Sequence, residues 1–385
     1  MTSSLTRQGA LNGGTDPRAL YLKLFSGEMF KGFQHNTIAR DLVTRRTLTN
    51  GRSLQFIYTG RTKAEFHVPG QSILGNDEKT PPVAEKTIEC DDLLISSAFV
   101  YELDETLAHY DLRGEISRKI GYALAENYDR RIFRAITKAA RQPSPVSMSN
   151  FVEPGGSVVK VGAAASTTAA DAYNAGHLVN AFYDAAAILD EKGVSGEGRV
   201  AVLNPRQYYA LIQDVTNNGL INRDVQGTAL QSGNGIIEIA GITIYKSMNI
   251  PFFGKFGTKT DMNPRASNDN EGSFVGEAMG DQDSKLTPSN SNTQKTINNY
   301  GTAAKFANSC GLIFQKEACG VVEAIGPQVQ VTSGDISVVY QGDVILGRLA
   351  MGANFLNPAA AVELVAGIDV SSNFNNTAVS NASFT

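Results

Sequence analysis

The sequence has no tryptophan, only three cysteines and no long apolar run. Cys90, Cys310 and Cys319 are too few and too irregularly spaced for a disulfide framework, and no CxxC pair suggests a metal or redox site. Nowhere do 18 uncharged apolar residues follow one another, and the Ser- and Gly-rich residues 1–15 lack the apolar stretch of a signal peptide. We therefore expect a soluble protein of a reducing compartment that has no membrane partner.

An excess of positive charge is absent as well. The 385 residues include 34 Lys and Arg against 38 Asp and Glu, which gives a net charge of -4 and a pI of about 5.7. General nucleic-acid binders carry clustered positive charge, so this composition argues against such a role. At the usual ~150 residues per domain, the length predicts about two lobes.

Patterns for catalysis or cofactor binding are also missing. The four histidines lie far apart and none has an i,i+4 partner, and no Walker, GxGxxG or GxSxG arrangement occurs. Asp91 and Asp92 are adjacent and would point to opposite faces of a strand, so we interpret them as part of a turn or of a strand end rather than as an acid/base pair. We expect no catalytic residue, no metal ion and no cofactor.

One very long helical pattern is present, at residues 104–141. Apolar residues recur there at helical spacing, Glu115 and Lys119 form an oriented i,i+4 pair on the other side, and Asp104 is the predicted N-cap. The apolar seam does not keep a seven-residue period. We therefore expect a supporting helix that lies along a surface rather than a coiled coil.

Residues 51–86, called the flap from here on, alternate as strands. The pattern predicts strands at 53–58, 63–68 and 85–89 around a polar connection. The apolar face is too small for the flap to fold alone, because an isolated two-stranded hairpin is marginally stable in water. The flap must therefore lie on something else.

The residues before the flap, 36–50, are polar and basic. Arg40, Arg45 and Arg46 would suit a clamp on a partner, and they would equally suit a solvated extended arm. The composition leaves both interpretations open.

The second half of the chain has an α/β pattern. Residues 168–171 fit a capping box for a helix that ends at Gly193, and a buried strand is predicted at 199–203. Asn, Asp, Ser, Thr and Gly dominate residues 254–303. We interpret that stretch as an insertion on the surface, because a structureless segment of such length is improbable inside a compact lobe.

The order of these elements, together with several short motifs, resembles a known family. The motifs are Ala19-Leu-Tyr-Leu-Lys-Leu-Phe-Ser-Gly-Glu28, Phe56 with Gly60-Arg61-Thr62, His67-Val-Pro-Gly70, Ala108-His109-Tyr110-Asp111-Leu112-Arg113, and Leu349-Ala-Met-Gly352 with Pro358 and Ala360-Ala361-Val362. The chain resembles phage major capsid proteins of the Hong Kong 97 fold, most of all the shell proteins of short-tailed, T-seven-like podophages (autographiviruses). The resemblance covers most of residues 19–365.

The resemblance implies an α+β fold with the family's domains. They are an N-terminal arm (1–50), an extended E-loop (51–86), a P-domain (87–153) with the spine helix 104–141, an α/β A-domain (154–324) with the polar insertion 254–303, the returning P-domain strands (325–370) and a C-terminal tail (371–385).

The resemblance also implies a function and partners. The chain would self-assemble through pentamers and hexamers into an icosahedral shell around double-stranded DNA, which it would contact weakly and without sequence preference. A separate scaffolding protein, a portal at one vertex and procapsid expansion are implied too, with the protein in the host cytoplasm during assembly and in the virion capsid afterwards.

Residues of the arm and the flap are the implied contacts between subunits. The candidates are Arg40, Arg45, Arg46, Arg52, Phe56, Arg61, Lys63 and Phe66. Some members of the fold crosslink an E-loop lysine to a P-domain asparagine, and Lys63 with Asn354 or Asn357 would suit that reaction, but the short-tailed group does not depend on it.

Two other functions are compatible with parts of the pattern. An encapsulin, a cellular compartment with the same fold, would enclose protein cargo instead of DNA. A soluble enzyme built on the α/β lobe would need a pocket with convergent polar groups, and the sequence offers no such group.

Overall fold

The computed structural model describes residues 38–62, 64, 66–70, 72, 81, 83–91, 93–107, 112–144, 147–148, 151–163, 166, 169–213, 237–251, 298, 300, 309–331 and 339–367. Most of the predicted arm, nearly all of the predicted insertion, the predicted tail and Lys63 lie outside the described residues. The chain divides into two compact units, and each is described by itself. Unit 1 comprises residues 1–37, 92–128 and 324–351, and unit 2 comprises residues 38–91, 129–323 and 352–385.

Unit 1 is built on an antiparallel strand pair. Strand β4 (Leu94–Tyr101) pairs with the first half of β13 (Gly342–Phe355), in a register that runs from Gly342 opposite Tyr101 to Leu349 opposite Leu94. Helix α1 (Glu102–Leu107) follows β4, and helix α2 (Leu112–Ala140) starts in this unit. The buried apolar side chains of the unit come from both strands and α2, and they are Val100, Leu112, Ile120, Leu124, Tyr128, Ile345, Leu349, Ala350 and Met351.

Three elements run from one unit into the other. They are α2, β13 and strand β12 (Cys319–Val331). Strands β12 and β13 belong to a four-stranded sheet of order β1-β12-β13-β4, in which β1 (Thr44–Thr47) pairs with β12 in parallel.

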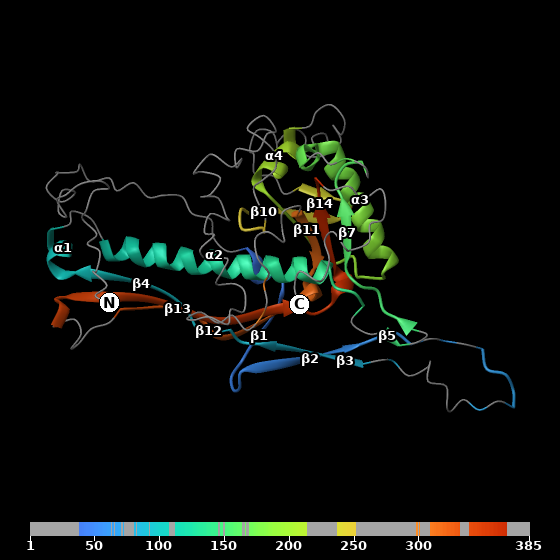
Figure 1. Ribbon diagram of the computed structural model, residues 1–385, viewed down its shortest axis with the longest axis horizontal. Coiled ribbons are helices and arrows are strands. Elements are labelled where there is room, and N and C mark those ends of the chain that lie inside the picture. Colours follow the sequence, from blue (N-terminus) through green and yellow to red (C-terminus); the bar gives the residue numbers. More distant parts are fainter. Residues whose placement is uncertain are drawn as a thin grey trace. The chain divides into compact units, whose positions relative to one another are not determined.

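The main sheet of unit 2 has six strands in the order β7-β14-β11-β8-β10-β9. Their bounds are β7 Ser157–Lys160, β8 Arg199–Leu203, β9 Ile237–Ile239, β10 Ile242–Lys246, β11 Ser309–Gln315 and β14 Ala361–Val365. Helices α3 (Ala175–Glu191) and α4 (Pro205–Gln213) lie beside this sheet in Figure 1. Leu178, Phe182 and Leu189 of α3 are fully buried in its core, as the i,i+4 and i,i+7 spacing of one helix face requires.

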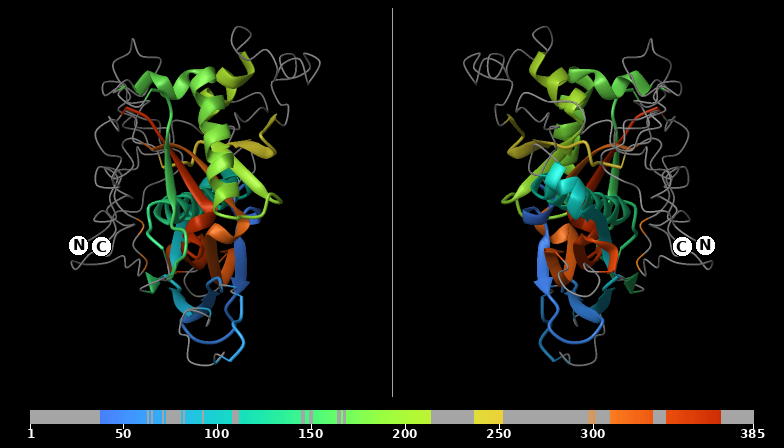
Figure 2. Two further views of the ribbon diagram at one scale, coloured as in Figure 1. Left: turned by 90° about the vertical axis from the view of Figure 1, so that its right-hand side faces the viewer. Right: turned by 90° about the vertical axis from the view of Figure 1, so that its left-hand side faces the viewer.

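Unit 2 also contains the flap. Strand β2 (Ser53–Thr59) pairs antiparallel with β3 (Val83–Glu89), from Ser53 opposite Glu89 to Thr59 opposite Val83. Figures 1 and 2 show this hairpin at the end of unit 2 opposite to α3 and α4. The shorter elements of the unit are β5 (Ser147–Met148), β6 (Phe151–Val152) and the 3-10 turns Ala39–Asp41, Ala169–Tyr173, Lys316–Ala318 and Pro358–Ala360.

The predicted helix 104–141 differs from the structure at its start. Helical structure begins at Glu102, so Asp104 lies inside α1 and its prediction as N-cap is wrong. The first amide of α1 donates to the main-chain carbonyl of Gln341 (3.1 Å), which satisfies one of the four amides that lack a partner within a helix. Residues 108–111, across which the sequence predicts continuity, lie outside the described residues.

The predicted capping box at residues 168–171 is also wrong. Residues 169–173 form a 3-10 turn, and Asn174 is the N-cap of α3, where its Oδ1 accepts from the amides of Gly176 (3.0 Å) and His177 (3.3 Å). The predicted end at Gly193 is confirmed. Gly193 has a φ of +70°, two residues beyond the last residue of α3.

The strand predicted at 63–68 is not formed by its described residues, 64 and 66–68. Phe66 is fully exposed there, and a strand is stable only where a neighbour takes its main-chain hydrogen bonds. The predicted strand 53–58 and the returning strand 85–89 are confirmed as β2 and β3.

Candidate functional site

The flap hairpin of unit 2 exposes large apolar side chains. It is a sheet of two strands, and exposed and half-buried residues alternate along β2. Ile57 and Val83 lie on the outward face and are 77% and 65% exposed, and Phe66 just beyond the hairpin is fully exposed. Large apolar side chains in water on a marginal hairpin are typical of a surface that another chain covers.

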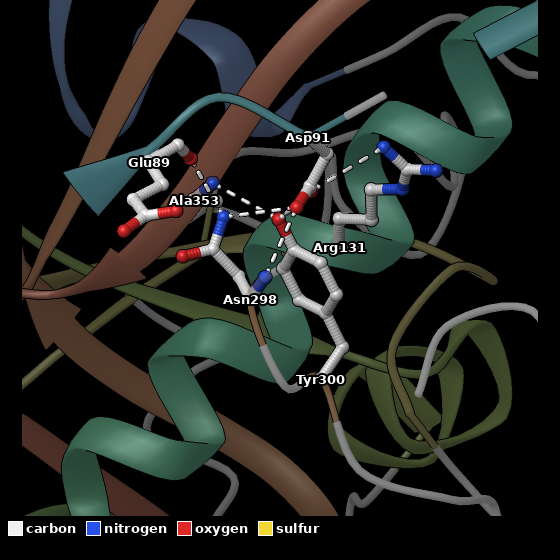
Figure 3. Close-up of polar contacts among 6 residues, drawn as sticks. All are labelled: Glu89, Asp91, Arg131, Asn298, Tyr300 and Ala353. Carbon is white, nitrogen blue, oxygen red and sulfur yellow. Dashed lines mark hydrogen bonds and ion pairs between the residues drawn. The ribbon is translucent and has the colours of Figure 1, made fainter. Parts of the chain in front are cut away.

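A buried polar cluster holds the base of the flap, where β3 ends. We call Asp91, Arg131, Asn298 and Tyr300 the base cluster (Figure 3). One oxygen of Asp91 accepts from the Tyr300 hydroxyl (2.6 Å), and the other accepts from the amide (3.1 Å) and side chain (3.0 Å) of Asn298. Asn298 also donates to the main-chain carbonyl of Glu89 (2.7 Å), the last residue of β3. The base cluster therefore fixes the end of the hairpin to residues about 200 positions away.

The charges of the base cluster are balanced inside the protein. The Arg131 guanidinium lies 3.7 Å from the Asp91 carboxylate and 5.8 Å from the centre of the Tyr300 ring, and the side chains of Arg131 and Asp91 are 6% and 1% exposed. Burial, and next the negative Asp91, raise the pKa of Tyr300 well above its usual range. Tyr300 is therefore a neutral donor to Asp91 at neutral pH, while its oxygen accepts from the amide of Ala353 (3.0 Å) in β13.

The last three turns of α2 carry further buried charges. Asp129 accepts hydrogen bonds from the amides of Ile38 (3.1 Å) and Ala39 (3.3 Å), which fixes the start of the described chain. Arg141, just after α2, makes two hydrogen bonds of 2.6 Å each to Glu363 of β14, and both side chains are completely buried. Buried charges of this kind are retained only when they are paired, and these pairs attach the start of the described chain and β14 to the C-terminal end of α2.

Two lysines lie near the same aromatic ring, beside the middle of the β2–β3 hairpin. The Lys86 nitrogen of β3 lies 3.7 Å from the centre of the Phe355 ring, and the Lys138 nitrogen of α2 lies 5.7 Å from it. Burial lowers the pKa of both lysines, and burial followed by the charge of Lys86 brings that of Lys138 to about 8.

The chain leaves the flap hairpin through Arg61, two residues after β2. The main-chain amide of Arg61 donates to Oε1 of Glu153, its Nε lies 3.6 Å from Oε2 of Glu153, and its terminal nitrogen donates to the carbonyl of Lys192. Tyr58 of β2 donates to the same carboxylate over 3.5 Å. Glu153 is 2% exposed and Arg61 is 56% exposed, so a buried carboxylate holds a partly solvated guanidinium.

A cavity of about 460 Å³ lies beside this contact. Its lining residues are Arg61, Gln142, Pro143, Ser144, Glu153, Pro154, Gly155, Gly156, Glu191 and Lys192. The Lys192 ammonium donates to the carbonyl of Gly155 (2.6 Å), and burial lowers its pKa to about 8. Both cationic side chains of the lining are thus bonded to the protein itself.

The predicted contact residues of the arm are engaged within the chain. Arg40 makes two hydrogen bonds to Glu323 (3.2 and 3.1 Å), and Arg45 forms an ion pair with the same carboxylate (3.6 Å). The Arg46 guanidinium lies 4.9 Å from the centre of the Phe56 ring. The arm residues therefore lie along β12 and β2 of their own unit, and a role between subunits stays a prediction.

The predicted contact residues of the flap differ in environment. Arg52 and Phe66 are exposed, Arg61 is bonded to Glu153, and Lys63 lies outside the described residues. Among the described candidates, the structure brings Arg40 and Arg45 together at Glu323 and places Arg46 over the Phe56 ring, but it does not gather the whole set into one site.

Sequence reasoning missed the residues that hold the flap. Asp91 was interpreted as part of a turn or of a strand end, Tyr300 and Asn298 were placed in a surface insertion, and Glu153 was not singled out. The surface interpretation is wrong for Asn298 and Tyr300, which are 7% and 1% exposed. The adjacent pair of acidic residues at a strand end was the available signal for Asp91, whereas no local signal identifies a partner 209 residues away.

Among the described residues, no group of three His, Cys, Asp or Glu side chains is arranged for a metal ion. The described helices include none with the length and hydropathy of a membrane span. All three cysteines are buried and none forms a disulfide, and burial raises the thiol pKa of Cys310 and Cys319, which opposes formation of a reactive thiolate.

Known proteins resemble this chain over nearly its whole length. A family described as "Gp10A-like: Major capsid protein" matches residues 55–365. The major capsid protein of Enterobacteria phage T3 is 24% identical over 365 residues, which are 94% of this chain and 95% of that protein. The major capsid protein of Escherichia phage T7 is 33% identical over 112 residues, which are 29% of this chain and 32% of that protein.

Solved structures of phage capsids also match this chain. The capsid structure of Cyanophage P-SCSP1u matches with a TM-score of 0.67 at 30% identity, over 95% of this chain and 99% of that one. The mature capsid of bacteriophage PhiM1 matches with a TM-score of 0.58 at 14% identity, over 94% and 99% of the two chains, which is a likeness of fold.

Proposed function

This chain belongs to the Gp10A-like family of phage major capsid proteins, and from that premise we propose how its copies build a shell. It is a structural protein of the virion capsid rather than an enzyme, it has a mixed α+β fold of the Hong Kong 97 type, and it assembles with copies of itself into an icosahedral shell.

We assign the parts of the chain to roles in that shell. The flap (51–86) is the E-loop, residues 87–153 with 325–370 form the P-domain around α2, and residues 154–324 form the A-domain. The arm 1–50 and the tail 371–385 flank them, and the A-domain gathers around the local five-fold and six-fold axes of pentamers and hexamers.

The exposed hairpin carries this assignment. Ile57, Val83 and Phe66 present apolar surface that the described residues leave uncovered, and burying such surface contributes roughly 25 cal/mol per Å². Docking on a neighbouring copy covers it, and head-to-tail contacts of this kind close into rings when the rotation between copies allows. The shell then rests mainly on repeated apolar and main-chain contacts, since exposed ion pairs contribute only about 0–1 kcal/mol each.

The predicted contacts between subunits follow from the same surface. The residues that we propose for this interface are Arg52, Phe56, Lys63 and Phe66 of the flap, with Arg40, Arg45 and Arg46 beside it. Arg61 belongs to the predicted set as well, and its guanidinium, like those of Arg40 and Arg45, is bonded within its own subunit.

Other partners belong to the proposal as well. A separate scaffolding protein guides assembly, a portal occupies one vertex, and the procapsid expands when it matures. The net charge of -4 favours weak, non-specific contact with packaged double-stranded DNA, because the phosphate backbone attracts clustered positive charge.

Electron microscopy of the chain co-expressed with its matched scaffolding protein tests the proposal. Uniform icosahedral particles are expected from the wild-type chain and from the conservative variant Phe66→Leu. Phe66→Ser lowers the particle yield without lowering the melting temperature of the unassembled chain, because the ring is fully exposed there. Normal yield from Phe66→Ser contradicts the proposed flap interface, and a wild-type chain that stays monomeric contradicts the assembly scheme as a whole.

A further inference from the structure

Arg61 is attached to its own subunit at two points. Its main-chain amide donates to Glu153, and its guanidinium reaches the carbonyl of Lys192 and lies 3.6 Å from the Glu153 carboxylate. One hydrogen bond would leave the chain free to rotate about it, whereas contacts from the main chain and the side chain of one residue fix the local direction of the chain. The path from Thr59 to Thr62 is therefore determined by Arg61.

The acceptors of Arg61 are suited to a cation. Glu153 is a carboxylate with 2% exposure, which stays charged and buried only with a partner. The Lys192 carbonyl lies at the C-terminal end of α3, where helix carbonyls lack intrahelical partners and the helix dipole favours positive charge. Gly193, with its φ of +70°, leaves the space that Arg61 uses, since a Cβ there would lie 3.1 Å from the guanidinium.

The carboxylate that receives Arg61 is itself held firmly. Glu153 follows β6 directly, and Gly156 three residues later donates to the carbonyl of Gln142 (2.9 Å) after the end of α2. A side chain at Gly156 would place its Cβ 2.3 Å from the Ala140 carbonyl oxygen, so this close approach requires glycine. Arg61 is thus attached to a rigid point of unit 2.

From these observations we propose that Arg61 is the positioning residue of the flap, which aims the chain beyond β2 through its contacts with Glu153 and the C-terminus of α3. The inference rests on the proposed role of the flap as the segment that docks on a neighbouring copy. It assigns to Arg61 a contact within its own subunit where the resemblance implied a contact between subunits. The exposed Phe66 and Val68 lie five and seven residues beyond Arg61, so the direction set there decides where their apolar side chains are presented.

Spin labels measure that direction in the unassembled full-length chain. Val68→Cys and Tyr183→Cys place one label beyond Arg61 and one on α3, both at exposed positions, while the three native cysteines are buried and escape labelling. The wild-type background gives a narrow distance distribution between the labels. Arg61→Ala widens it at least about twofold, because the chain then samples several directions, and Arg118→Ala, which removes an exposed arginine from a surface pair on α2, leaves it narrow.

Assembly with the matched scaffolding protein gives the second measurement, on the chain without labels. Arg61→Ala lowers the yield of uniform shells by about fivefold and Arg118→Ala does not, since loss of a partly exposed contact reduces the fraction of correctly aimed flaps by about that factor. Arg61→Gln removes the guanidinium and keeps part of the side chain, so it is the substitute if Arg61→Ala fails to fold by circular dichroism.

The outcomes separate the two proposals. A narrow distribution in Arg61→Ala overturns the positioning role, and a wide distribution with wild-type shell yield overturns its importance for assembly. If the wild-type chain builds no shells, the proposed function fails, while the label distances still decide whether Arg61 aims the flap.

Discussion

The two ends of the flap hairpin are each held by a buried carboxylate, yet the partners of the two carboxylates differ. At the base, Asp91 is enclosed by Tyr300, Asn298 and Arg131, all of them buried (Figure 3). At the distal end, Glu153 meets Arg61, whose side chain is 56% exposed.

Burial decides what each carboxylate does for the molecule. Groups of the base cluster have no access to water if a partner is lost, so the full cost of an unsatisfied buried polar group falls on the folded state. Arg61 regains water when its contact breaks, and the free energy of that contact is small. The base cluster therefore contributes to the stability of the fold, and the contact between Arg61 and Glu153 sets the direction of the chain beyond β2.

Asp91→Ala gives the largest expected effect. It removes the acceptor of Tyr300 and Asn298 and leaves the buried Arg131 charge without its carboxylate. We expect the free energy of unfolding to fall by about 3–5 kcal/mol, the range for breaking a buried ion pair. Urea unfolding of the unassembled chain measures it.

Arg118→Ala is the control for this variant, because Arg118 is about half exposed and makes an i,i+3 pair with Glu115 on α2. That change is expected to cost no more than about 1 kcal/mol. Equal losses in the two variants would refute the distinct role of the base cluster.

Tyr300→Phe isolates the hydroxyl from the rest of the cluster. The ring stays, but Asp91 loses a donor at 2.6 Å and the amide of Ala353 loses its acceptor. We expect a loss of about 1–3 kcal/mol, as for one buried hydrogen bond to a charged group. Thermal unfolding of Tyr300→Phe and Asp91→Ala, measured side by side, tests whether Tyr300→Phe is the less destabilising variant. A larger loss of stability in Tyr300→Phe than in Asp91→Ala would contradict this order.

The sequence could predict those features of the flap and of the α/β lobe whose signals lie within a single segment. Alternation of apolar residues predicted β2 and β3, and a continuous apolar run predicted β8 at 199–203, because those signals lie within the segment itself. The positive φ of Gly193 at the end of α3 was predictable for the same reason.

Features that depend on distant partners were not predictable in this way. Tyr300 stands in a polar stretch that has the composition of a surface loop, and only the folded chain brings it to Asp91. The strand predicted at 63–68 had a suitable pattern and no strand to pair with among the described residues. The fold class came from the resemblance, since composition and periodicity alone indicate only strands, a long helix and an α/β lobe.

Lys86 and Lys138, at the middle of the β2–β3 hairpin, predict that the free energy of unfolding depends on pH. The size of this effect is expected to lie between the effects of variants at the two ends of the hairpin. Lys138 has a pKa of about 8, below its ordinary 10.5, because burial and then the charge of Lys86 disfavour the ammonium. In this range the unfolded chain binds more protons than the folded chain, so stability rises with pH. We expect a gain of at most about 1.4 kcal/mol for this group between pH 8 and 9.

Other buried groups also change the stability between pH 8 and 9. Lys192, also with a pKa of about 8, acts in the same sense as Lys138. The raised thiol pKa of Cys310 and Cys319 acts in the opposite sense, since the unfolded thiols ionise near pH 9 and the folded ones do not. Urea unfolding at pH 8 and 9 should therefore show a smaller rise for Lys138→Met than for the wild type, and an unchanged rise would exclude Lys138 as its source.

Arg61→Ala gives the smallest expected effect on stability, so it is the most sensitive test of the difference between the two ends of the hairpin. Its guanidinium is more than half exposed, and a broken contact is replaced by water, so the free energy of unfolding should change by no more than about 1 kcal/mol. Glu153→Gln should cost more, because the buried carboxylate also accepts from Tyr58 and from the Arg61 amide. Urea unfolding of both variants tests this order. If Arg61→Ala destabilises the chain as strongly as Asp91→Ala, the distal end supports the fold as the base does, and the separation between stability and direction is wrong.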